Sequence, residues 1–475
     1  MRYISTRGEA PALDFEDVLL AGLARDGGLY VPESWPPLAA DDDADDADDA
    51  DDDYAVLAVR VMAPYVGDAI AAADFAAMVA ETASEFDHPE VAPLVALGDD
   101  RYLLELFHGP TLAFKDHALQ LLGRLFDHVL ARRGERITIV GATSGDTGSA
   151  AIAACRDRAT MEIFILHPHG RVSEVQRRQM TTVDAANVHN IAVEGSFDDC
   201  QDLVKALFAD GALRAELRLA AVNSINWARI MAQIVYYVWA AHKLDRRGRP
   251  LAFAVPTGNF GNVFAGYAAS RMGLPVARLA VGSNRNDILT RFLDGGIMET
   301  RAVEPSLSPS MDIQISSNFE RLLFELSARD GAAVAAEMAN FRITGRLAVG
   351  AERWQAARAL FAGHRLDDAA TLAEMRRIHE ETGMLVDPHS AIGIAAGRAL
   401  RADPDMPPDT PIVALATAHP AKFPDAVERA TGVRPELPAR LADLGARRER
   451  YAILPNDFSA VRDFIHARAA LRGAA

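Results

Sequence analysis

Short apolar runs recur along the chain from about residue 101, and helical patterns separate several of them. The lengths and β-branched residues of these runs are typical of strands. Between residues 118 and 129, apolar residues instead repeat every three or four positions, which predicts an amphipathic helix. The predicted strands are 101–107, 136–141, 161–167, 188–193, 251–256, 278–282 and 411–416. The apolar face of the predicted helix comprises Ala118, Leu121, Leu122, Leu125 and Val129.

The alternation of strands with helices predicts an α/β fold with mostly parallel sheets. A chain of 475 residues is too long for one ordinary domain. We expect two α/β domains, 96–235 and 236–475, after a small, mostly helical N-terminal domain, 1–95. These boundaries are approximate, and the domains can interleave along the chain. The part from about 300 to 385 is helix-rich and less regular.

More than half of the net negative charge of the chain comes from one segment. The formal net charge is −17, and the run 41–53 (DDDADDADDADDD) contains ten acids, without which the net charge is −7. Like charges at this density repel one another and bury nothing, so we expect a solvated, disordered insert. The arginines are dispersed among more numerous acids, which argues against nucleic-acid binding.

Targeting, membrane and metal signals are weak. The start, MRYISTRGEAP, lacks the apolar stretch of a secretion signal, and the longest apolar segment, 234–241, is too short to cross a bilayer. We therefore expect a cytoplasmic protein without a membrane partner. Cys155 and Cys200 have no spacing that indicates zinc or redox chemistry, so we expect no metal site and two cysteines that pack as small apolar side chains.

Lysine is rare in this chain, and one lysine has an unusual setting. Lys115 is one of four lysines and lies in HGPTLAFKDH (108–117), after a Gly-Pro turn and an apolar run. Arginine stays protonated and cannot act as an amine nucleophile. Apolar neighbours disfavour the charged form of a lysine and so lower the pKa of its amine. Lys115 is therefore a candidate for amine chemistry. The alternative is a surface lysine at a helix start.

Two loops join an apolar strand to a helix and are rich in small residues. VGATSGDTGSAA (140–151) supplies Gly, Ser and Thr after the strand 136–141, and PTGNFGN (256–262) follows the strand 251–256. Small residues allow backbone N–H groups to approach an anion, and a helix start adds partial positive charge. Each loop is therefore a candidate site for a carboxylate or phosphate. The alternative for each is a plain strand-to-helix turn.

A third loop, ATAHPAKF (416–423), follows the strand 411–416. Open α/β sheets bind ligands at the C-terminal ends of their strands. Thr417 at such an end is placed to meet a ring nitrogen or a similar acceptor. The alternative is an ordinary loop in which His419 is satisfied by backbone groups.

The motifs LFHGPTLAFKD, ATSGDTGSAA, NSINWARI, GNFGN and TAHPAKF occur in this order, after MRYISTRG and DGGLYVP near the start. In these motifs the chain resembles the pyridoxal-phosphate-dependent threonine synthases, in the branch with an N-terminal extension. The resemblance covers nearly the whole chain and implies the fold of the tryptophan-synthase-β class (fold type II), in which the cofactor lies between two α/β domains.

The resemblance also implies a role for each motif. Lys115 would form the Schiff base with pyridoxal 5'-phosphate, and Thr417 would hydrogen-bond its pyridine nitrogen. Many relatives in the wider fold class have Asn at the position of Asp146, which leaves the partner of the cofactor's 3-hydroxyl open. The loop that would hold the cofactor phosphate comprises Gly258, Asn259, Phe260, Gly261 and Asn262. The loop that would bind the substrate carboxylate comprises Thr143, Ser144, Gly145, Asp146 and Thr147. The residues that would bind a substrate phosphate are Asn223, Ser224, Asn226 and Arg229.

The implied activity is that of a carbon–oxygen lyase acting on phosphate in threonine biosynthesis. O-phospho-L-homoserine and water would give L-threonine and phosphate by γ-elimination and β-addition. Arg229 also suits this substrate physically, because a guanidinium binds phosphate in a bidentate manner. Its alternative is an arginine on a helix surface. The expected partner is this small molecule, and the expected assembly is a monomer or a homodimer.

Three other functions are weighed. A pyridoxal-phosphate-dependent serine or threonine dehydratase-like lyase would need no second anion site. A second alternative is a catalytically silent relative that binds pyridoxal phosphate or a protein partner, and the retention of Lys115 and both anion loops argues against it. A nicotinamide-dependent oxidoreductase would need a dinucleotide fingerprint and a ribose-binding acid, and neither occurs in register.

Overall fold

The computed structural model describes residues 1–38, 53–221, 224–244 and 248–473. The chain forms two compact units, each built from two segments. The first unit comprises Met1–Ala118 and Ser224–Pro435, and the second comprises Leu119–Asn223 and Glu436–Ala475. The units therefore interleave along the chain, and the domains 1–95, 96–235 and 236–475 stay a prediction. The acidic run lies outside the described residues except for Asp53, the N-cap of helix α2.

The first unit contains a six-stranded sheet in the order β13-β10-β9-β14-β4-β3. Neighbouring strands are parallel except for β3, which pairs antiparallel with β4. The central strand β9 is buried along its whole length, as an all-apolar strand of a parallel sheet should be. The strands are β3 (Leu94–Gly98), β4 (Arg101–Glu105), β9 (Leu251–Pro256), β10 (Val276–Ser283), β13 (Phe361–Arg365) and β14 (Ile412–Ala416).

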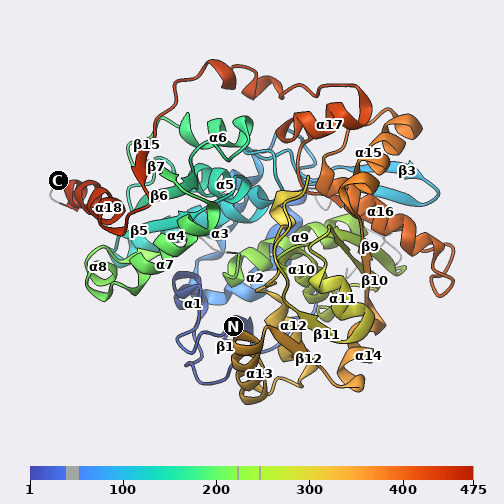
Figure 1. Cartoon of the computed structure of the whole chain (residues 1–475). Coiled ribbons are helices and arrows are strands. Elements are labelled where there is room, and N and C mark those ends of the chain that lie inside the picture. The colour runs from blue at the N-terminus through green and yellow to red at the C-terminus, as the bar shows by residue number, and fades with distance from the viewer. Residues whose placement is uncertain (39–52, 222–223, 245–247, 474–475) are drawn as a thin grey trace. The chain divides into compact units, whose positions relative to one another are not determined.

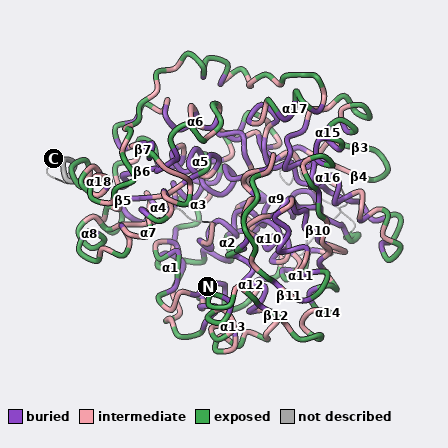
Figure 2. Tube along the Cα trace, viewed as in Figure 1, coloured by how far each residue is buried: buried purple, intermediate pink, exposed green. Residues whose placement is uncertain are grey.

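Helices of the first unit cover this sheet, as Figure 1 shows for α16 beside β9 and β10. Helix α9 is buried from Trp227 to Ala241, which Figure 2 shows as a continuous buried trace. The helices are α1 (Phe15–Ala21), α2 (Tyr54–Val66), α3 (Ala72–Ala83), α9 (Trp227–Leu244), α10 (Gly261–Arg271), α11 (Ile288–Gly295), α12 (Phe319–Leu326), α13 (Gly331–Thr344), α14 (Ala351–Leu360), α15 (Asp368–Thr382), α16 (Pro388–Ala402) and α17 (Pro424–Thr431).

Among its described residues, the first unit also contains two small antiparallel sheets and three 3-10 turns. The strand pairs are β1 (Tyr3–Ser5) with β2 (Tyr30–Pro32), and β11 (Ile297–Glu299) with β12 (Arg346–Ala348). The 3-10 turns are η2 (Gly67–Ala69), η3 (Pro309–Met311) and η4 (Pro420–Lys422).

The second unit contains a parallel five-stranded sheet in the order β15-β7-β6-β5-β8. Its strands are β5 (Ile137–Ala142), β6 (Met161–Pro168), β7 (Val188–Glu194), β8 (Leu219–Ala220) and β15 (Ala452–Pro455). Its helices and turns are α5 (Asp146–Cys155), α6 (Glu174–Thr181), α7 (Phe197–Ala209), α8 (Gly211–Glu216), η5 (Ala439–Leu441), η6 (Leu444–Ala446) and α18 (Phe458–Gly473). Helix α4 (Lys115–Arg133) begins in the first unit and continues in the second.

Local chemistry explains where several helices begin. Ser196 and Asp199 form a capping box at the start of α7, so both side chains satisfy backbone N–H groups there. Asp387 caps α16, and Pro388 occupies its first turn, where a missing N–H costs nothing. Apolar residues of α7 and α18, including Leu203 and Val461, then pack on the sheet of the second unit as one core.

The structure confirms the α/β fold class with mostly parallel sheets. All seven predicted strands form, and the predicted helix 118–129 lies within α4. Cys155 and Cys200 are buried free thiols, as expected, and burial raises the pKa of each to about 12. Within the described ranges, no helix combines the length and apolarity needed to span a membrane.

Candidate active site

Lys115 is the first residue of α4, and its side chain is buried. Its Nζ lies 5.2 Å from the centroid of the Phe114 ring. The segment before it runs beside the end of β14: the Phe114 N–H donates to the Thr417 carbonyl at 2.9 Å, and the His419 N–H donates to the Leu112 carbonyl at 3.0 Å. The backbone thus brings the predicted Schiff-base lysine and the predicted partner of the ring nitrogen into neighbouring segments.

The turn before Lys115 is held by buried charged groups. The Asp116 carboxylate accepts from the Thr111 N–H at 2.8 Å and from the Thr111 hydroxyl at 2.7 Å. Lys422, which is fully buried, donates from Nζ to the Thr111 carbonyl at 2.7 Å. A Cβ on Gly109 would lie 2.5 Å from the Asp116 Cβ, so this turn requires glycine. Sequence reasoning assigned no role to Asp116 or Lys422.

The other lysines make surface ion pairs. Lys205 pairs with Asp202 at 2.8 Å, and Lys243 pairs with Glu90 at 2.7 Å. Lys205 is exposed, and an exposed pair contributes little to stability. Lys243 is half-buried, and its Nζ lies 4.8 Å from the centroid of the Trp239 ring. Lys115 and Lys422 are therefore the two lysines held inside the protein, and the geometry around Thr111 gives Lys422 a structural task.

Thr417 is buried directly after β14. Its N–H donates to the Ser390 hydroxyl at 3.1 Å, and that hydroxyl donates to the Asp387 carboxylate. Asp387 also lies 2.7 Å from Nδ1 of His389, whose Nε2 accepts from the Ser310 N–H at 3.3 Å. These contacts fix the start of α16 beside Thr417. The signal that was missed is DPHS (387–390), an N-cap followed by Pro at a helix start.

The loop 258–262 joins β9 to α10. Phe260 precedes α10 in the left-handed region (φ 62°), and no side chain caps the helix. The Asn262 Oδ1 accepts from the hydroxyls of Tyr236 at 2.6 Å and Tyr237 at 2.9 Å. Its Nδ2 is buried and has no hydrogen-bond partner among the described residues. In this orientation of the amide the two tyrosines occupy Oδ1 and leave Nδ2 to donate, and a helix start with a donor that remains to be used suits an anion.

The first half of this loop is held by the segment 310–317. The Gly258 carbonyl accepts from the Ser316 hydroxyl at 2.8 Å, and the Asn259 Oδ1 accepts from the Ser317 N–H at 2.8 Å. A Cβ on Gly258 would lie 3.0 Å from the Met311 Cα. The loop therefore has a fixed course before it reaches the helix.

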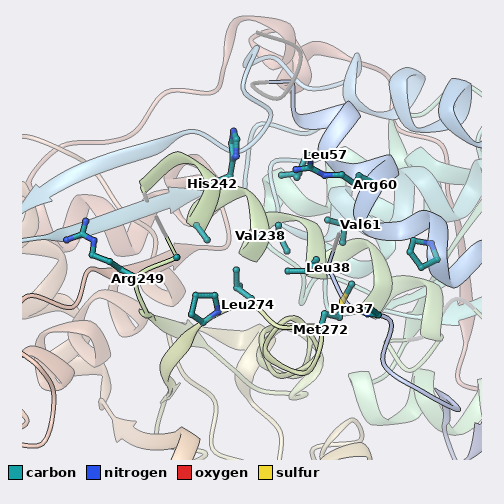
Figure 3. Close-up of a pocket in the computed structure, with 14 residues that line it drawn as sticks. Pro37, Leu38, Leu57, Arg60, Val61, Val238, His242, Arg249, Met272 and Leu274 are labelled. Carbon is teal, nitrogen blue, oxygen red and sulfur yellow. The ribbon is translucent and has the colours of Figure 1, made fainter. Parts of the chain in front are cut away.

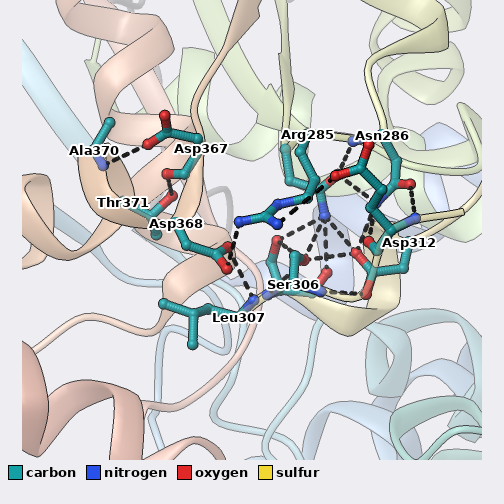
Figure 4. Close-up of polar contacts among 12 residues, drawn as sticks. Arg285, Asn286, Ser306, Leu307, Asp312, Asp367, Asp368, Ala370 and Thr371 are labelled. Carbon is teal, nitrogen blue, oxygen red and sulfur yellow. Dashed lines mark hydrogen bonds and ion pairs between the residues drawn. The ribbon is translucent and has the colours of Figure 1, made fainter.

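A buried polar cluster holds the start of that segment (Figure 4). The Asp312 carboxylate accepts from Asn284 Nδ2 at 2.8 Å, Asn286 Nδ2 at 3.0 Å and the Ser306 hydroxyl at 2.6 Å. Burial raises the pKa of Asp312, while these hydrogen bonds act in the opposite direction. Such a network is rigid when every member is satisfied.

Arg229 lies in the first turn of α9 and is 3% exposed. Its Nε and Nη1 are buried without hydrogen-bond partners among the described residues, and burial lowers its pKa to about 10. At neutral pH this is a buried cation that still has donors to offer, and an anion is a ligand well suited to such a group.

The other residues of the NSINWARI motif differ from one another. Asn226 Nδ2 donates to the Leu19 carbonyl at 2.8 Å, and its Oδ1 accepts from the Ala228 N–H at 3.0 Å, so both ends of this amide serve the backbone. The Ser224 hydroxyl contacts Asn259 Nδ2. The motif and the loop 258–262 therefore meet directly. Asn223 lies outside the described residues.

The loop 143–147 belongs to the second unit. The Thr143 hydroxyl accepts from the N–H groups of Gly145 at 3.0 Å and Gly148 at 2.9 Å. The Asp146 carboxylate accepts from Gln176 Nε2 at 2.7 Å. Ser144 is exposed, and Thr147 is half-buried. The loop is thus completed by its own hydroxyl and one amide, while two of its hydroxyls remain accessible.

A cavity of about 180 Å³ lies elsewhere in the first unit (Figure 3). Apolar side chains of α2 and α9, such as Leu57 and Val238, form much of its lining, and Arg60, His242 and Arg249 contribute polar groups. No residue of the predicted active site lines it. The cavity is therefore separate from the predicted active site.

The comparisons with known proteins identify the family of the chain. Residues 91–348 match the family described as "Pyridoxal-phosphate dependent enzyme". Residues 2–83 match "Threonine synthase N terminus", and residues 390–465 match "Threonine synthase, C-terminal". The fold and the family matches therefore define the class: a pyridoxal-phosphate-dependent enzyme of fold type II.

Individual relatives narrow the class. The chain is 57% identical to a threonine synthase of Pseudomonas aeruginosa over 98% of both chains. A pyridoxal-phosphate-bound threonine synthase structure from Brucella melitensis superposes with a TM-score of 0.93 at 50% identity, over 99% of both chains. The yeast threonine synthase structure gives 0.92 at 38% identity, again over 99% of both chains. The chain belongs to the threonine synthase family, and the predicted class of pyridoxal-phosphate-dependent lyase in amino-acid biosynthesis is confirmed.

Proposed function

We propose that this family member converts O-phospho-L-homoserine and water into L-threonine and phosphate by γ-elimination and β-addition. The observation that carries the proposal is Arg229, a buried guanidinium with two nitrogens that have no hydrogen-bond partner among the described residues. Its neighbour in the chain, Ile230, and Ser224 of the same motif lie against the loop 258–262, which already suits one phosphate. A substrate with its own phosphate would supply the missing anion. A serine or threonine dehydratase would leave this charge buried without a partner.

The residues present fit pyridoxal 5'-phosphate. Lys115 offers a buried amine, Asn262 offers an unused donor at the start of α10, and Thr417 offers a hydroxyl beside the lysine segment. When bound, the cofactor supplies an electron sink for negative charge at the substrate Cα. The neutral hydroxyl of Thr417 would leave the ring nitrogen less protonated than a carboxylate would.

Proton transfer falls to Lys115 in this proposal. Its amine accepts the Cα proton, passes that proton to the substrate phosphate, and then accepts the Cβ proton as phosphate leaves from Cγ, while Arg229 neutralises the phosphate charge. Lys115 delivers the Cβ proton to Cγ. The neutral amine then takes a proton from water as the hydroxyl adds at Cβ, and it gives that proton to Cα. The loop 143–147 holds the substrate carboxylate through its accessible hydroxyls and N–H groups. One amine in several proton transfers needs a fixed place, which the turn at Thr111 supports.

Two alternatives remain: a dehydratase-like lyase, and a silent relative that binds the cofactor. The test is to incubate the cofactor-loaded enzyme with O-phospho-L-homoserine and to measure phosphate and L-threonine. We expect both products in equal amounts. With L-serine or L-threonine we expect little keto acid. Keto acid as the main product, or no product from any of these substrates, would overturn the proposal.

Arg229→Met provides the residue-level test. Because a buried charged contact would be lost, kcat/KM for O-phospho-L-homoserine should fall by about 10³. Arg342→Met, at an exposed position of α13, is the matched control and should leave kcat/KM unchanged. The cytoplasmic location and the monomer-or-homodimer assembly stay predictions.

A further inference from the structure

Asn318 lies immediately before α12 and is fully buried. Its Nδ2 donates to two carbonyls, that of Ser224 at 3.1 Å and that of Asn259 at 3.1 Å. Its own N–H donates to the Asn259 carbonyl at 3.2 Å. One amide therefore joins the segment of the proposed substrate-phosphate site to the loop of the proposed cofactor-phosphate site.

Arg321 holds this amide from the next turn. Its side chain is fully buried, and its Nη1 contacts the Asn318 Oδ1. Its Nε and Nη2 donate to the Tyr30 carbonyl at 3.0 and 2.9 Å, and Nη2 also donates to the Ile225 carbonyl at 2.5 Å. The guanidinium lies 5.9 Å from the ring centroid of Trp227. A planar group with fixed donors to three segments permits little movement of any of them.

The start of α10 also lies very close to the Asn318 amide. A Cβ on Gly261 would lie 3.2 Å from the Asn318 Nδ2, so the start of α10 approaches this amide as nearly as a glycine permits. The Ser224 hydroxyl also contacts Asn259 Nδ2. The distance between the two segments is therefore set by Asn318 together with the direct contact of Ser224 and Asn259.

We propose that Asn318, held in place by Arg321, is a positioning residue that fixes the distance between the two phosphate sites and so selects an amino acid phosphorylated at Cγ. This inference rests on the proposed function. With the cofactor bound, Lys115 would hold the amino end of the substrate near the reacting carbons and the start of α10 would hold the cofactor phosphate, so the distance that Asn318 fixes would favour one length of side chain for a phosphate bound by Arg229. O-phospho-L-serine, which is one carbon shorter, reaches that site less well.

Asn318→Asp tests the donor role. The variant keeps an oxygen for Arg321 but replaces the Nδ2 donor with an oxygen that faces two carbonyls. We expect KM for O-phospho-L-homoserine to rise about tenfold with kcat within about threefold, because roughly two hydrogen bonds of modest net value are lost. The dissociation constant for pyridoxal 5'-phosphate should rise. The preference for O-phospho-L-homoserine over O-phospho-L-serine, measured as the inhibition constant of O-phospho-L-serine divided by KM for O-phospho-L-homoserine, should fall about tenfold.

Two further variants separate positioning from general stability. Asn340→Asp, exposed on α13, is the matched control and should change none of these constants. Arg321→Lys keeps the charge but cannot reach Tyr30, Ile225 and Asn318 together, so it should lower the same preference with Asn318 itself intact. A lower Tm with an unchanged KM and an unchanged preference in the folded enzyme would indicate a merely structural role and overturn the inference.

The outcomes also separate this inference from the proposed function. If the wild-type enzyme releases phosphate and L-threonine while Asn318→Asp keeps its KM, cofactor affinity and preference, the inference is wrong and the function stands. If the wild-type enzyme binds pyridoxal 5'-phosphate but does not act on O-phospho-L-homoserine, the proposed function is wrong and the inference falls with it.

Discussion

The loops 143–147 and 258–262 have the same place in two different sheets, yet their polar groups are used differently. Each follows a parallel strand and begins a helix. In the first loop, the Thr143 hydroxyl accepts two backbone N–H groups, and Gln176 binds Asp146. In the second loop, no side chain caps α10, and the Asn262 Nδ2 is buried without a partner among the described residues.

The difference indicates what each loop needs from a ligand. The loop 143–147 satisfies one N–H of its helix start, that of Gly148, with its own Thr143 hydroxyl, so a substrate can come and go without leaving that group unsatisfied. The loop 258–262 depends on other segments for its course and leaves a donor for a resident anion. A loop completed from within suits a passing substrate, whereas a loop completed by its ligand suits a cofactor that stays.

Asn262→Asp should give the largest effect. The variant keeps the acceptor for Tyr236 and Tyr237 but points a carboxylate oxygen where the donor was, toward the proposed phosphate. The dissociation constant for pyridoxal 5'-phosphate, measured by fluorescence titration, should rise about 100-fold, because a charge-assisted hydrogen bond becomes a repulsion. An affinity within twofold of the wild type would contradict the assignment of this loop to the cofactor phosphate.

Gly145→Ala should give the next largest effect, and here it is the free energy of unfolding that changes. Gly145 has φ 148°, and an added Cβ would lie 2.5 Å from the Gln176 side chain, so the variant should lose about 2 kcal/mol by urea denaturation. Gly170→Ala is the matched control, since Gly170 has φ +68° but open space around it. Equal losses in the two variants would show that the contact with Gln176 is unimportant.

Thr143→Val should give the smallest effect. It removes the hydroxyl that accepts from Gly145 and Gly148, which should lower the free energy of unfolding by about 1 kcal/mol. Thr143→Ser keeps the oxygen and should recover most of that loss. Cofactor affinity should not change in either variant. A loss of cofactor affinity in Thr143→Val would contradict the assignment of the loop 143–147 to the substrate and of the loop 258–262 to the cofactor.

The sequence predicts those strands that are apolar along their whole length. The strand β9 is apolar throughout and buried, and its predicted bounds match the structure. The strand β13 (FAGHR) is half-buried, charged at its end and directly follows α14, so its pairing with β10 provides the order that its sequence does not. The interleaving of the two units depends on packing between distant segments, which no local pattern contains.

The same limit applies to the site. Lys115 and the glycine loops stand out as motifs, but Asn318 and Arg321 lie in a region without one. The sequence of α12, FERLLFEL, contains a weaker signal: two charged residues, Glu320 and Arg321, lie in an otherwise apolar helix and are buried in the structure. Glu320 binds Arg7 at 2.8 Å, and Arg321 binds backbone carbonyls. Buried charges inside an apolar helix therefore mark residues that connect segments.

The central claim is that Lys115 carries the cofactor, and four lysines make it directly testable. The protein loaded with pyridoxal 5'-phosphate is reduced with borohydride, digested and analysed by mass spectrometry. We predict a stoichiometric pyridoxyl group on Lys115 and none on Lys422, which is fully buried. The label should be lost in Lys115→Ala. Label on Lys422, Lys205 or Lys243 in place of Lys115, or no label at all, would contradict the account.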